Sequence, residues 1–320
     1  MIDIDGAART LRGIVRRTPL LESPLLNERL GCRLLVKAEP LQITGSFKVR
    51  GACNKLATVE EGKPVVAYSS GNHAQGVAYA ARLKGVPCTI VMPTDAPRIK
   101  QDGTRAYGAT VRLYDRRFED REAIGAAVAA ETGAVLVRPY DDPLVIAGQG
   151  TVGLEIAEDC AALDIVPDLA FCCCGGGGLI AGVGLALRRS FPDLAVFAVE
   201  PEGYDDTARS LEAGRRVEVE GHPATLCDAI VTRSPGEITF PINQEILSGG
   251  VAVGDAETKA AMRLAFHHLK LVVEPGGAVA IAAVVAGKVA VKGKTVLAVA
   301  SGGNVDPELF AQVLAEGGAD

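Results

Sequence analysis

The sequence predicts an α/β protein whose strands form doubly wound parallel sheets. From about residue 65 onward, short apolar runs alternate with longer amphipathic ones, as strands alternate with helices in such folds. Glycine and small polar residues follow several of the apolar runs, and parallel sheets bind ligands at these carboxyl ends of their strands. The expected strands are too many for one compact sheet, so we expect two sheets.

The apolar runs predict strands, in chain order, at residues 65–68, 86–92, 110–114, 134–137, 169–174, 195–199 and 295–300. The amphipathic runs predict helices at residues 73–84, 121–131, 179–188, 257–270 and 307–315. Residues 271–290 are apolar but are interrupted by Glu274, Pro275 and Gly276, which indicates a turn followed by a buried helix. Residues 215–254 lack periodicity, and we expect them to wrap the surface.

Composition excludes several classes of protein. Of the 320 residues, 48% are hydrophobic and 22% are charged, which is typical of a globular chain. The net charge of −6 comes without a basic block, so we expect no nucleic-acid partner. No uncharged apolar stretch reaches the roughly 18 residues of a membrane span, so no membrane partner is expected. The N-terminus lacks the pattern of a signal peptide.

The eight cysteines are scattered, which predicts neither a disulfide framework nor a paired zinc site. Cys172, Cys173 and Cys174 are consecutive, and strand alternation would turn the middle thiol away from the other two. We expect them to be small buried residues at the end of a strand. This cysteine usage favours a reducing compartment, so we expect a cytoplasmic protein.

A polar segment follows the first predicted strand. Ser69-Ser70-Gly71-Asn72-His73 precedes a helix whose first N–H groups could hold an anion such as a carboxylate. A plain capped turn is the alternative, although a cap needs fewer polar residues. We therefore favour an anion site.

Four consecutive glycines, Gly175, Gly176, Gly177 and Gly178, follow the strand at 169–174. Such a loop lets the backbone approach a ligand closely and turn its N–H groups toward a phosphate. The loop lacks the Lys-Ser/Thr of a P-loop and the G-x-G-x-x-G spacing of a dinucleotide fold, so a monophosphate fits better than ATP or NAD. Tight packing of a strand against a helix would need only one or two glycines.

Two further segments are weak signals when each is taken singly. Ser301-Gly302-Gly303-Asn304 follows the strand at 295–300 and could present a hydroxyl to a ring nitrogen, or could be a simple turn. Lys48 lies between Phe47 and Val49, which is unusual for a solvated lysine. A partly desolvated lysine can form a Schiff base, and an exposed lysine beside a turn is the alternative. Together, a lysine, a monophosphate cradle and polar strand ends describe a pyridoxal-phosphate site.

These four segments closely resemble those of the threonine/serine dehydratase and serine racemase family, pyridoxal-phosphate enzymes of fold type II, which is similar to the tryptophan synthase β subunit. The segments are Gly45-Ser46-Phe47-Lys48-Val49-Arg50-Gly51, Ser69-Ser70-Gly71-Asn72-His73-Ala74-Gln75-Gly76, residues 175–178 and Ser301-Gly302-Gly303-Asn304. The match covers nearly the whole chain in order and spacing. It implies two doubly wound parallel-sheet domains with the cofactor in the cleft between them. The expected large cofactor-binding domain is residues 1–52 and 143–320, the small substrate-loop domain is residues 53–142, and the assembly is a homodimer.

The resemblance also implies roles for single residues. Lys48 would hold the cofactor as a Schiff base and later remove the Cα proton of the substrate. Asn72 would bind the ring hydroxyl of the cofactor, residues 175–178 its phosphate, and Ser301 its pyridine nitrogen. A neutral hydroxyl at that nitrogen would limit the electron sink and favour elimination. Phe47 would pack beside the ring, unless it is ordinary core.

The implied substrate is a small β-hydroxy amino acid whose carboxylate meets the loop of Ser69, Ser70, Gly71, Asn72 and His73. The implied reaction is the β-elimination of water from L-threonine or L-serine, which gives a 2-oxo acid and ammonia. Ser70 keeps 3-hydroxyaspartate dehydratase and serine racemase open as alternatives, because its hydroxyl could reprotonate Cα on the face opposite Lys48.

Two other classes of protein remain as alternatives. A β-replacing synthase shares the fold but usually carries Thr-Gly where this chain has His73-Ala74. A non-catalytic cofactor-binding protein is disfavoured by the presence of both Lys48 and Ser70.

An acidic cluster follows the strand at 195–199. In the serine racemase branch, the positions that match Glu200, Tyr204 and Asp206 coordinate Mg²⁺ or Ca²⁺ through two carboxylates and a carbonyl. The resemblance therefore implies a divalent cation, and a helix N-terminus lined by acids is the alternative. Glu274 could line the cofactor side or be a solvated turn carboxylate.

Overall fold

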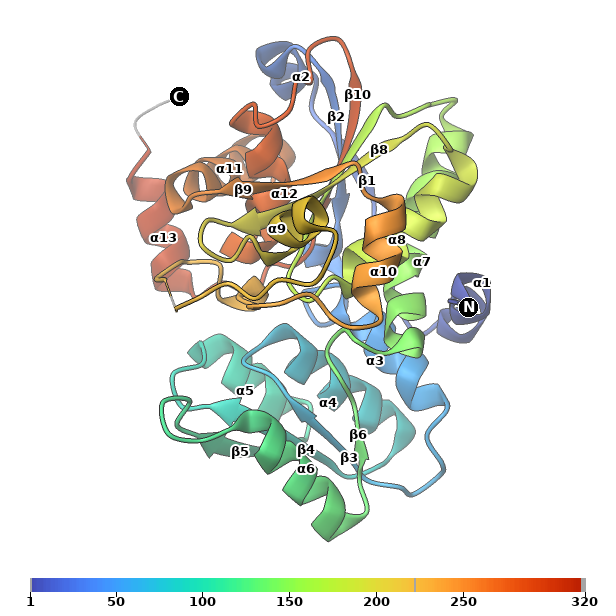
Figure 1. The fold of residues 1–320 in the computed structure, drawn as a ribbon, viewed down its shortest axis with the longest axis vertical. Coiled ribbons are helices and arrows are strands. Elements are labelled where there is room, and N and C mark those ends of the chain that lie inside the picture. Colours follow the sequence, from blue (N-terminus) through green and yellow to red (C-terminus); the bar gives the residue numbers. More distant parts are fainter. Residues whose placement is uncertain (1, 222, 318–320) are drawn as a thin grey trace.

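The computed structural model describes residues 2–221 and 223–317. As predicted, the chain forms two α/β domains, each built on its own parallel sheet, and they lie one above the other in Figure 1. The helices α3 (Lys48–Ala57) and α7 (Pro143–Ala162) pack against each other near the level where the two domains meet.

The larger sheet has six strands in the order β1-β2-β10-β7-β8-β9. They are β1 (Leu20–Glu22), β2 (Arg33–Ala38), β7 (Leu169–Cys173), β8 (Ala195–Pro201), β9 (Gly249–Val253) and β10 (Thr295–Ala300). Every neighbouring pair is parallel except β1 with β2. The short connection through α2 (Pro24–Leu30) explains this exception, because a parallel pair needs a crossover of about a dozen residues or more.

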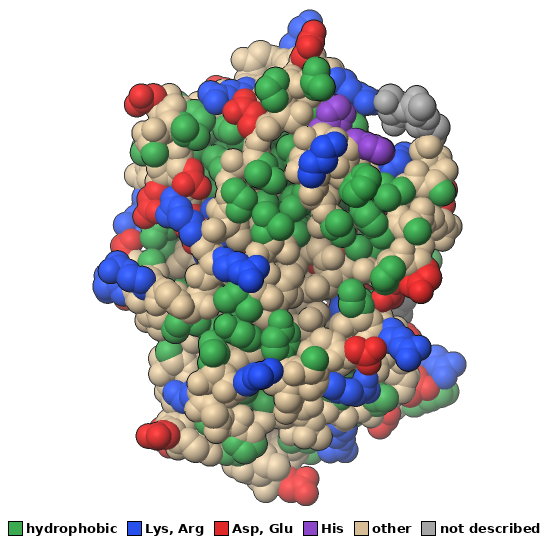
Figure 2. All heavy atoms as spheres, turned by 180° about the vertical axis from the view of Figure 1, so that it is seen from behind, with side chains coloured by type: hydrophobic (Ala, Val, Ile, Leu, Met, Phe, Trp, Pro, Cys, Tyr) green, Lys and Arg blue, Asp and Glu red, His purple; other side chains and the backbone are tan. Residues whose placement is uncertain are grey.

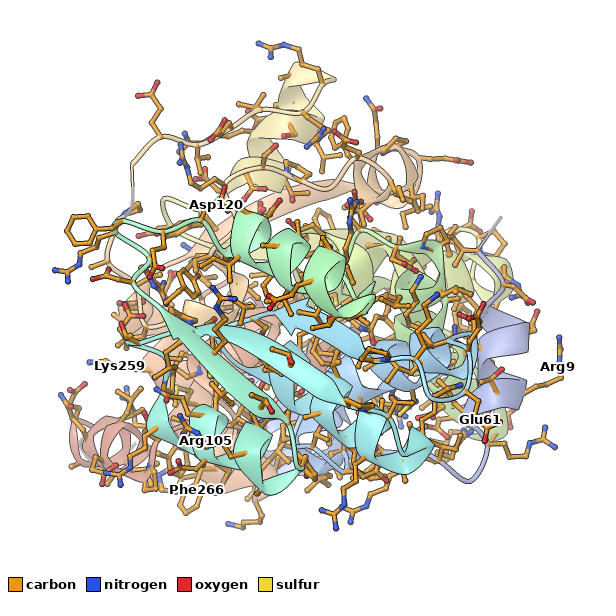
Figure 3. The ribbon with its side chains drawn as sticks, turned by 90° about the horizontal axis from the view of Figure 1, so that it is seen from below. Arg9, Glu61, Arg105, Asp120, Lys259 and Phe266 are labelled. Carbon is orange, nitrogen blue, oxygen red and sulfur yellow. The ribbon has the colours of Figure 1, made fainter. Side chains whose placement is uncertain are left out.

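The smaller sheet is wholly parallel, with the strand order β5-β4-β3-β6. Its strands are β3 (Val65–Tyr68), β4 (Cys88–Pro93), β5 (Thr110–Tyr114) and β6 (Val135–Leu136). Figure 3 shows α6 (Arg121–Thr132), which follows the labelled Asp120, on one face of this sheet. The helices α4 (Asn72–Lys84) and α5 (Arg98–Ala106), the latter carrying the labelled Arg105, cover the other face.

The remaining helices surround the larger sheet. They are α1 (Ile4–Leu11), α8 (Gly178–Ser190), α9 (Asp206–Ala213), α10 (Thr239–Ile246), α11 (Asp255–Leu269), α12 (Pro275–Val285) and α13 (Pro307–Ala315), with the short 3-10 turns η1 (Glu39–Leu41) and η2 (Asp228–Ile230). Nearly every residue of α12 is buried, which confirms the predicted turn followed by a buried helix. None of the helices in the part of the chain that the structure describes is long and apolar enough to cross a membrane.

Part of the glycine content serves helix packing. A Cβ atom at Gly182 of α8 would lie 2.5 Å from the Ile146 carbonyl oxygen and 2.6 Å from the Gly150 nitrogen of α7. Only glycine allows the two helix backbones to approach this closely. The long helix α7 is thereby held against α8, which begins at the four-glycine loop.

The predicted strands at 65–68, 110–114 and 295–300 are confirmed, as is the burial of Cys172, Cys173 and Cys174; the other five cysteines are buried as well. The interpretation of residues 215–254 as an aperiodic surface segment is wrong in part. Its C-terminal half forms α10 and the edge strand β9, whose Gly-Gly start hides the strand pattern in the sequence. The strands β1 and β2, which precede residue 65, lie outside the predicted set.

Candidate active site

Lys48 is the first residue of α3, and its side chain is partly buried. Its Nζ atom donates a hydrogen bond to the Pro139 carbonyl oxygen at 2.8 Å and lies 5.1 Å from the centre of the Phe47 ring. Burial lowers the pKa of Lys48 to about 8, so the neutral amine is accessible near neutral pH. This is the state in which a lysine can form a Schiff base.

The backbone holds the Lys48 segment against the Ser301 segment. The Phe47 N–H donates to the Ser301 carbonyl oxygen at 3.0 Å, and Ser46 forms an antiparallel bridge with Gly302. Ser301 follows β10 and is 5% exposed, so its hydroxyl lies inside the protein rather than on a surface turn. Two segments that are weak signals singly are thus one structural unit.

The polar segment after β3 leads into α4. Gly71 is the N-cap residue of this helix, and its N–H donates to the Ser69 Oγ atom at 3.1 Å. A Cβ atom at Gly76 would lie 3.1 Å from the Lys48 carbonyl carbon and oxygen, so this glycine lets α4 pack directly on the start of α3. The sequence Ala74-Gln75-Gly76 therefore brings the polar segment beside Lys48.

The side chain of Asn72 is held from both sides. Its Nδ2 atom donates to the Glu274 Oε1 atom, and its Oδ1 atom accepts a hydrogen bond from Asn304 Nδ2 at 2.8 Å. Glu274 is 1% exposed, so the interpretation as a solvated turn carboxylate is wrong. The carboxylate is turned inward because it precedes α12 at the junction between the domains.

His73 is buried, and its Nε2 atom lies 3.0 Å from the Val137 carbonyl oxygen. Burial lowers the pKa of His73 to about 3, so the imidazole is neutral at physiological pH. A neutral ring that faces a carbonyl carries its proton on Nε2. Ser70 is only partly buried and precedes Gly71 at the start of α4.

The four glycines link β7 to α8, and Gly177 has a φ of +86°, in the left-handed region that glycine adopts without strain. The carbonyl oxygens of Gly176 and Gly177 accept hydrogen bonds from Thr239 and Asn243. Among the described residues, the N–H groups of Gly175, Gly176 and Gly177 donate to no other protein group. The aromatic ring of Tyr140 lies within 2.4 Å of where a Cβ atom at Gly176 would be. A side chain at Gly176 would therefore collide with Tyr140, and the loop retains free N–H donors, as a phosphate cradle requires.

The acidic cluster follows the glycine loop in the sequence and lies between β8 and α9. Glu200 accepts hydrogen bonds from the backbone N–H groups of Thr207 and Ala208, at 2.8 and 2.9 Å. Both carboxylate oxygens of Asp206 are buried and have no hydrogen-bond partner among the residues that the structure describes. Burial raises the pKa of Glu200 to about 7 and that of Asp206 to about 8. Within the described ranges, no group of three or more His, Cys, Asp or Glu side chains is placed to hold a metal ion.

The orphan oxygens of Asp206 fit a hard cation, because a buried carboxylate needs a partner. Asp205 is different, since it pairs with Arg209 at the surface. The Glu200 oxygens are already engaged at the start of α9, as the alternative of a helix N-terminus lined by acids describes.

Several residues at the site are not identified by the sequence patterns. Lys100 of α5 is 1% exposed and pairs with both Asp228 and Glu274. Tyr140 covers the glycine loop, and Thr239 and Asn243 bind its carbonyl oxygens. All of these contacts join elements that are remote in the sequence, so no local spacing reveals them.

The residues present fit a pyridoxal phosphate. The site brings together a lysine with a lowered pKa, a glycine loop with free N–H groups, and a buried serine at the end of a central strand. The amine, the phosphate cradle and the ring-nitrogen partner are the three attachments that this cofactor needs.

A family model described as "Pyridoxal-phosphate dependent enzyme" matches residues 11–302. An L-threo-3-hydroxyaspartate ammonia-lyase of Pseudomonas sp is 45% identical over 315 residues, which cover 98% of this chain and 97% of that protein. A serine racemase of Schizosaccharomyces pombe is 37% identical over 317 residues, which cover 98% of this chain and 97% of that protein. The solved structure of a threonine deaminase from T.th. is 46% identical, with a TM-score of 0.89 over 95% of this chain and 98% of that one.

Proposed function

Because the chain belongs to the family of pyridoxal-phosphate-dependent enzymes, we propose that it is an ammonia-lyase that removes water from a small L-β-hydroxy amino acid. The products would be a 2-oxo acid and ammonia. The observation that carries this proposal is the junction of Lys48 with the Ser301 segment, within packing distance of the polar segment after β3. L-threonine and L-serine are the proposed substrates.

When bound, the cofactor supplies an electron sink that makes the Cα proton of the substrate acidic. Lys48 would hold the cofactor and, once released from it, would accept that proton at Nζ. The N–H groups of the glycine loop would bind the phosphate, and Ser301 would meet the ring nitrogen without adding a charge. Asn72 would bind the ring hydroxyl. Phe47, whose ring lies under the Lys48 ammonium, would limit the directions that the amine can take.

The segment Ser69, Ser70, Gly71, Asn72 and His73 would bind the substrate carboxylate at the N-terminus of α4. His73 would support this segment by packing and not by charge, because its ring faces the Val137 carbonyl oxygen and does not titrate near neutral pH. Ser70 would lie on the face of the substrate opposite Lys48.

A second candidate function is favoured by Ser70 and by the comparisons. The relatives include both a hydroxyaspartate ammonia-lyase and a serine racemase. A hydroxyl opposite Lys48 is the group that racemisation needs and that simple dehydration does not. We therefore keep 3-hydroxyaspartate dehydration and serine racemisation as alternatives on the same site.

A divalent cation, Mg²⁺ or Ca²⁺, is the proposed partner of the acidic cluster. The unpartnered, buried oxygens of Asp206 support it. Glu200 and the Tyr204 carbonyl would complete the set of protein ligands, with water in the remaining positions. The cation would be structural, because the cluster lies between β8 and α9, which carry none of the residues proposed to bind the cofactor or the substrate.

A homodimer and the division of the chain into residues 1–52 with 143–320 and residues 53–142 are also proposed. All four strands of the smaller sheet fall within 53–142, which supports this division.

Figure 2 shows hydrophobic side chains gathered beside the purple histidines. Phe266, which precedes His267 in the sequence, and Val272, four residues after His268, are 36% and 42% exposed. Such a face would favour association with a second copy.

The substrate panel that tests the proposed activity consists of L-serine, D-serine, L-threonine and the diastereomers of 3-hydroxyaspartate. The measurements are 2-oxo acid, ammonia and the enantiomer that remains. We expect equal amounts of 2-oxo acid and ammonia from at least one L-substrate. Inversion without ammonia would assign the racemase alternative, and no reaction with any member would overturn the proposal.

A further inference from the structure

Lys100 is a buried cation for which the proposed chemistry has no role. It comes from α5 of the small domain, yet its ammonium lies 2.9 Å from the Asp228 Oδ2 atom and 2.9 Å from the Glu274 Oε2 atom of the large domain. Its aliphatic stem packs on Gly71, where a Cβ atom would lie 2.5 Å from Lys100 Cδ. Because a buried charge is costly unless it is paired, this arrangement must be maintained by its partners.

Glu274 connects Lys100 to Asn72. One carboxylate oxygen, Oε2, faces Lys100, and the other, Oε1, accepts the hydrogen bond from Asn72 Nδ2. An ionised carboxylate can only accept hydrogen bonds, whereas a protonated one can also donate. Burial raises the pKa of Glu274, and the Lys100 ammonium opposes this shift. The Lys100 ammonium, 2.9 Å from Oε2, favours the ionised carboxylate, which accepts only.

The oxygen of the Asn72 amide is fixed as well, in the orientation that places its nitrogen toward Glu274. Asn304 Nδ2 donates to the Thr44 carbonyl oxygen at 2.9 Å and to Asn72 Oδ1 at 2.8 Å. Since a backbone carbonyl can only accept, the Asn304 amide cannot reverse without losing this bond. Asn72 thus has its oxygen engaged by Asn304 and one N–H engaged by Glu274. The second N–H of its amide is the group left to bind a ligand.

We propose that Lys100 is a positioning residue that fixes the Asn72 amide, through Glu274, so that an N–H group and not the carbonyl oxygen faces the ring hydroxyl of the cofactor. This inference rests on the proposed function. A donor at this position stabilises the deprotonated ring hydroxyl, and an acceptor would stabilise the protonated one. The two forms differ in colour, because the deprotonated form gives the long-wavelength absorption band of bound pyridoxal phosphate and the protonated form gives the near-ultraviolet band.

The variants Lys100→Met and Glu274→Gln test the relay. Lys100→Met keeps a stem of similar length against Gly71 and removes the charge. Glu274→Gln leaves Lys100 in place, but the ammonium would attract the new amide oxygen and turn the amide nitrogen toward Asn72. A charged hydrogen bond contributes roughly tenfold or more to such an equilibrium. We therefore expect each variant to lower the ratio of the long-wavelength band to the near-ultraviolet band by about tenfold.

A double variant tests whether Lys100 acts through Glu274. If it does, Lys100→Met/Glu274→Gln shifts the band ratio no further than the larger of the two single changes. Binding of pyridoxal phosphate to the apoprotein, followed by fluorescence, gives a second measurement that does not depend on turnover. We expect this binding to weaken in the same order as the band ratio.

Two matched controls separate the relay from general effects. Lys37 is also a fully buried lysine, and its partner Glu155, at 2.7 Å, is not one of the groups that hold Asn72, so Lys37→Met should lower stability without changing the band ratio. Asp228→Asn removes the other partner of Lys100 and leaves the Glu274 pair intact. A simple tie between the domains would make Asp228→Asn as harmful as Lys100→Met.

The relay is overturned if Lys100→Met keeps the band ratio of the parent protein, if Asp228→Asn shifts the ratio as far, or if the two changes in the double variant add. If Lys100→Met does not fold, an unchanged ratio in Glu274→Gln overturns it equally. A parent protein that forms no long-wavelength band with pyridoxal phosphate would instead overturn the proposed function.

Discussion

At the scale of single residues, the site consists of groups whose hydrogen-bonding state is fixed by their neighbours. His73 is neutral because it is buried, and the pKa of Lys48 is lowered to about 8 for the same reason. Asn72 is held between Glu274 and Asn304. Ser70 stands apart from this set, because it is only partly buried.

The proposed position of Ser70, on the face of the substrate opposite Lys48, leads to a prediction for Ser70→Ala. Dehydration of an L-substrate needs a base on the Lys48 side only, whereas racemisation and the dehydration of D-serine also need a proton group on the opposite face. We expect the variant to lose racemisation and D-serine dehydration by about 100-fold or more, while much of the L-substrate dehydration remains. Initial rates with L- and D-serine, measured side by side, check this. Equal losses with both enantiomers would show that Ser70 positions the substrate instead.

The residues of the four motifs could be predicted from the sequence because each motif is local, with glycines and polar groups at fixed offsets after a strand. The sequence could not reveal Lys100, since nothing in its neighbours Ile99 and Gln101 indicates burial beside two carboxylates. The same is true of Tyr140, which reaches the glycine loop from a separate segment. Contacts between distant segments depend on the packing of the domains, and composition and periodicity do not report it.

At the scale of elements, the start of α3 decides where Lys48 lies. Two residues after Lys48, the Arg50 side chain is fully buried between Glu39 of η1, at 2.8 Å, and Glu155 of α7, at 2.6 Å. The guanidinium thus joins three elements at the base of the site. The segment at 215–254, predicted to wrap the surface, contains an element that the sequence does not reveal. Its edge strand β9 has the sequence Gly-Gly-Val-Ala-Val, and this short run with two glycines carries too little pattern to be recognised as a strand.

We expect Arg50→Met to destabilise the protein by about 3–5 kcal/mol, because the buried Glu39 carboxylate and the partly buried Glu155 carboxylate would lose their common partner. The free energy of unfolding in urea checks this value. Arg17→Met is the matched control, since Arg17 pairs with Glu158 and Asp159 at a surface where its side chain is half exposed, and such pairs contribute roughly 0–1 kcal/mol. If the two variants are equally stable, the buried pairs of Arg50 do not hold α3 in place.

At the scale of the whole molecule, the site exists only where the two domains meet. Lys100, Asn72 and His73 come from the smaller domain, and Ser301, Glu274 and the glycine loop come from the larger one. The sequence predicts two sheets and the positions of most strands, but the order of the strands within each sheet, the antiparallel edge strand β1 and the contacts across the junction depend on how the elements pack. The acidic cluster follows β8, within the larger domain.

If that cluster holds a divalent cation, chelation should lower the melting temperature. A cation at about 100 times its dissociation constant contributes about 2.7 kcal/mol to stability. We expect Asp206→Asn to remove the response to chelator and Asp205→Asn to retain it, because Asp205 pairs with Arg209 instead. An unchanged melting temperature after exhaustive chelation would assign these acids to the N-terminus of α9 alone.

We propose that one lysine amine, that of Lys48, both holds the cofactor and moves the substrate proton. The most direct measurement compares 2-oxo acid formation by the parent protein and by Lys48→Ala, each saturated with pyridoxal phosphate and checked for its fold by circular dichroism. We expect turnover by the parent protein and, in a folded Lys48→Ala, a loss of turnover to background together with the loss of the long-wavelength absorption band. Parent-like 2-oxo acid formation by a folded Lys48→Ala would contradict it.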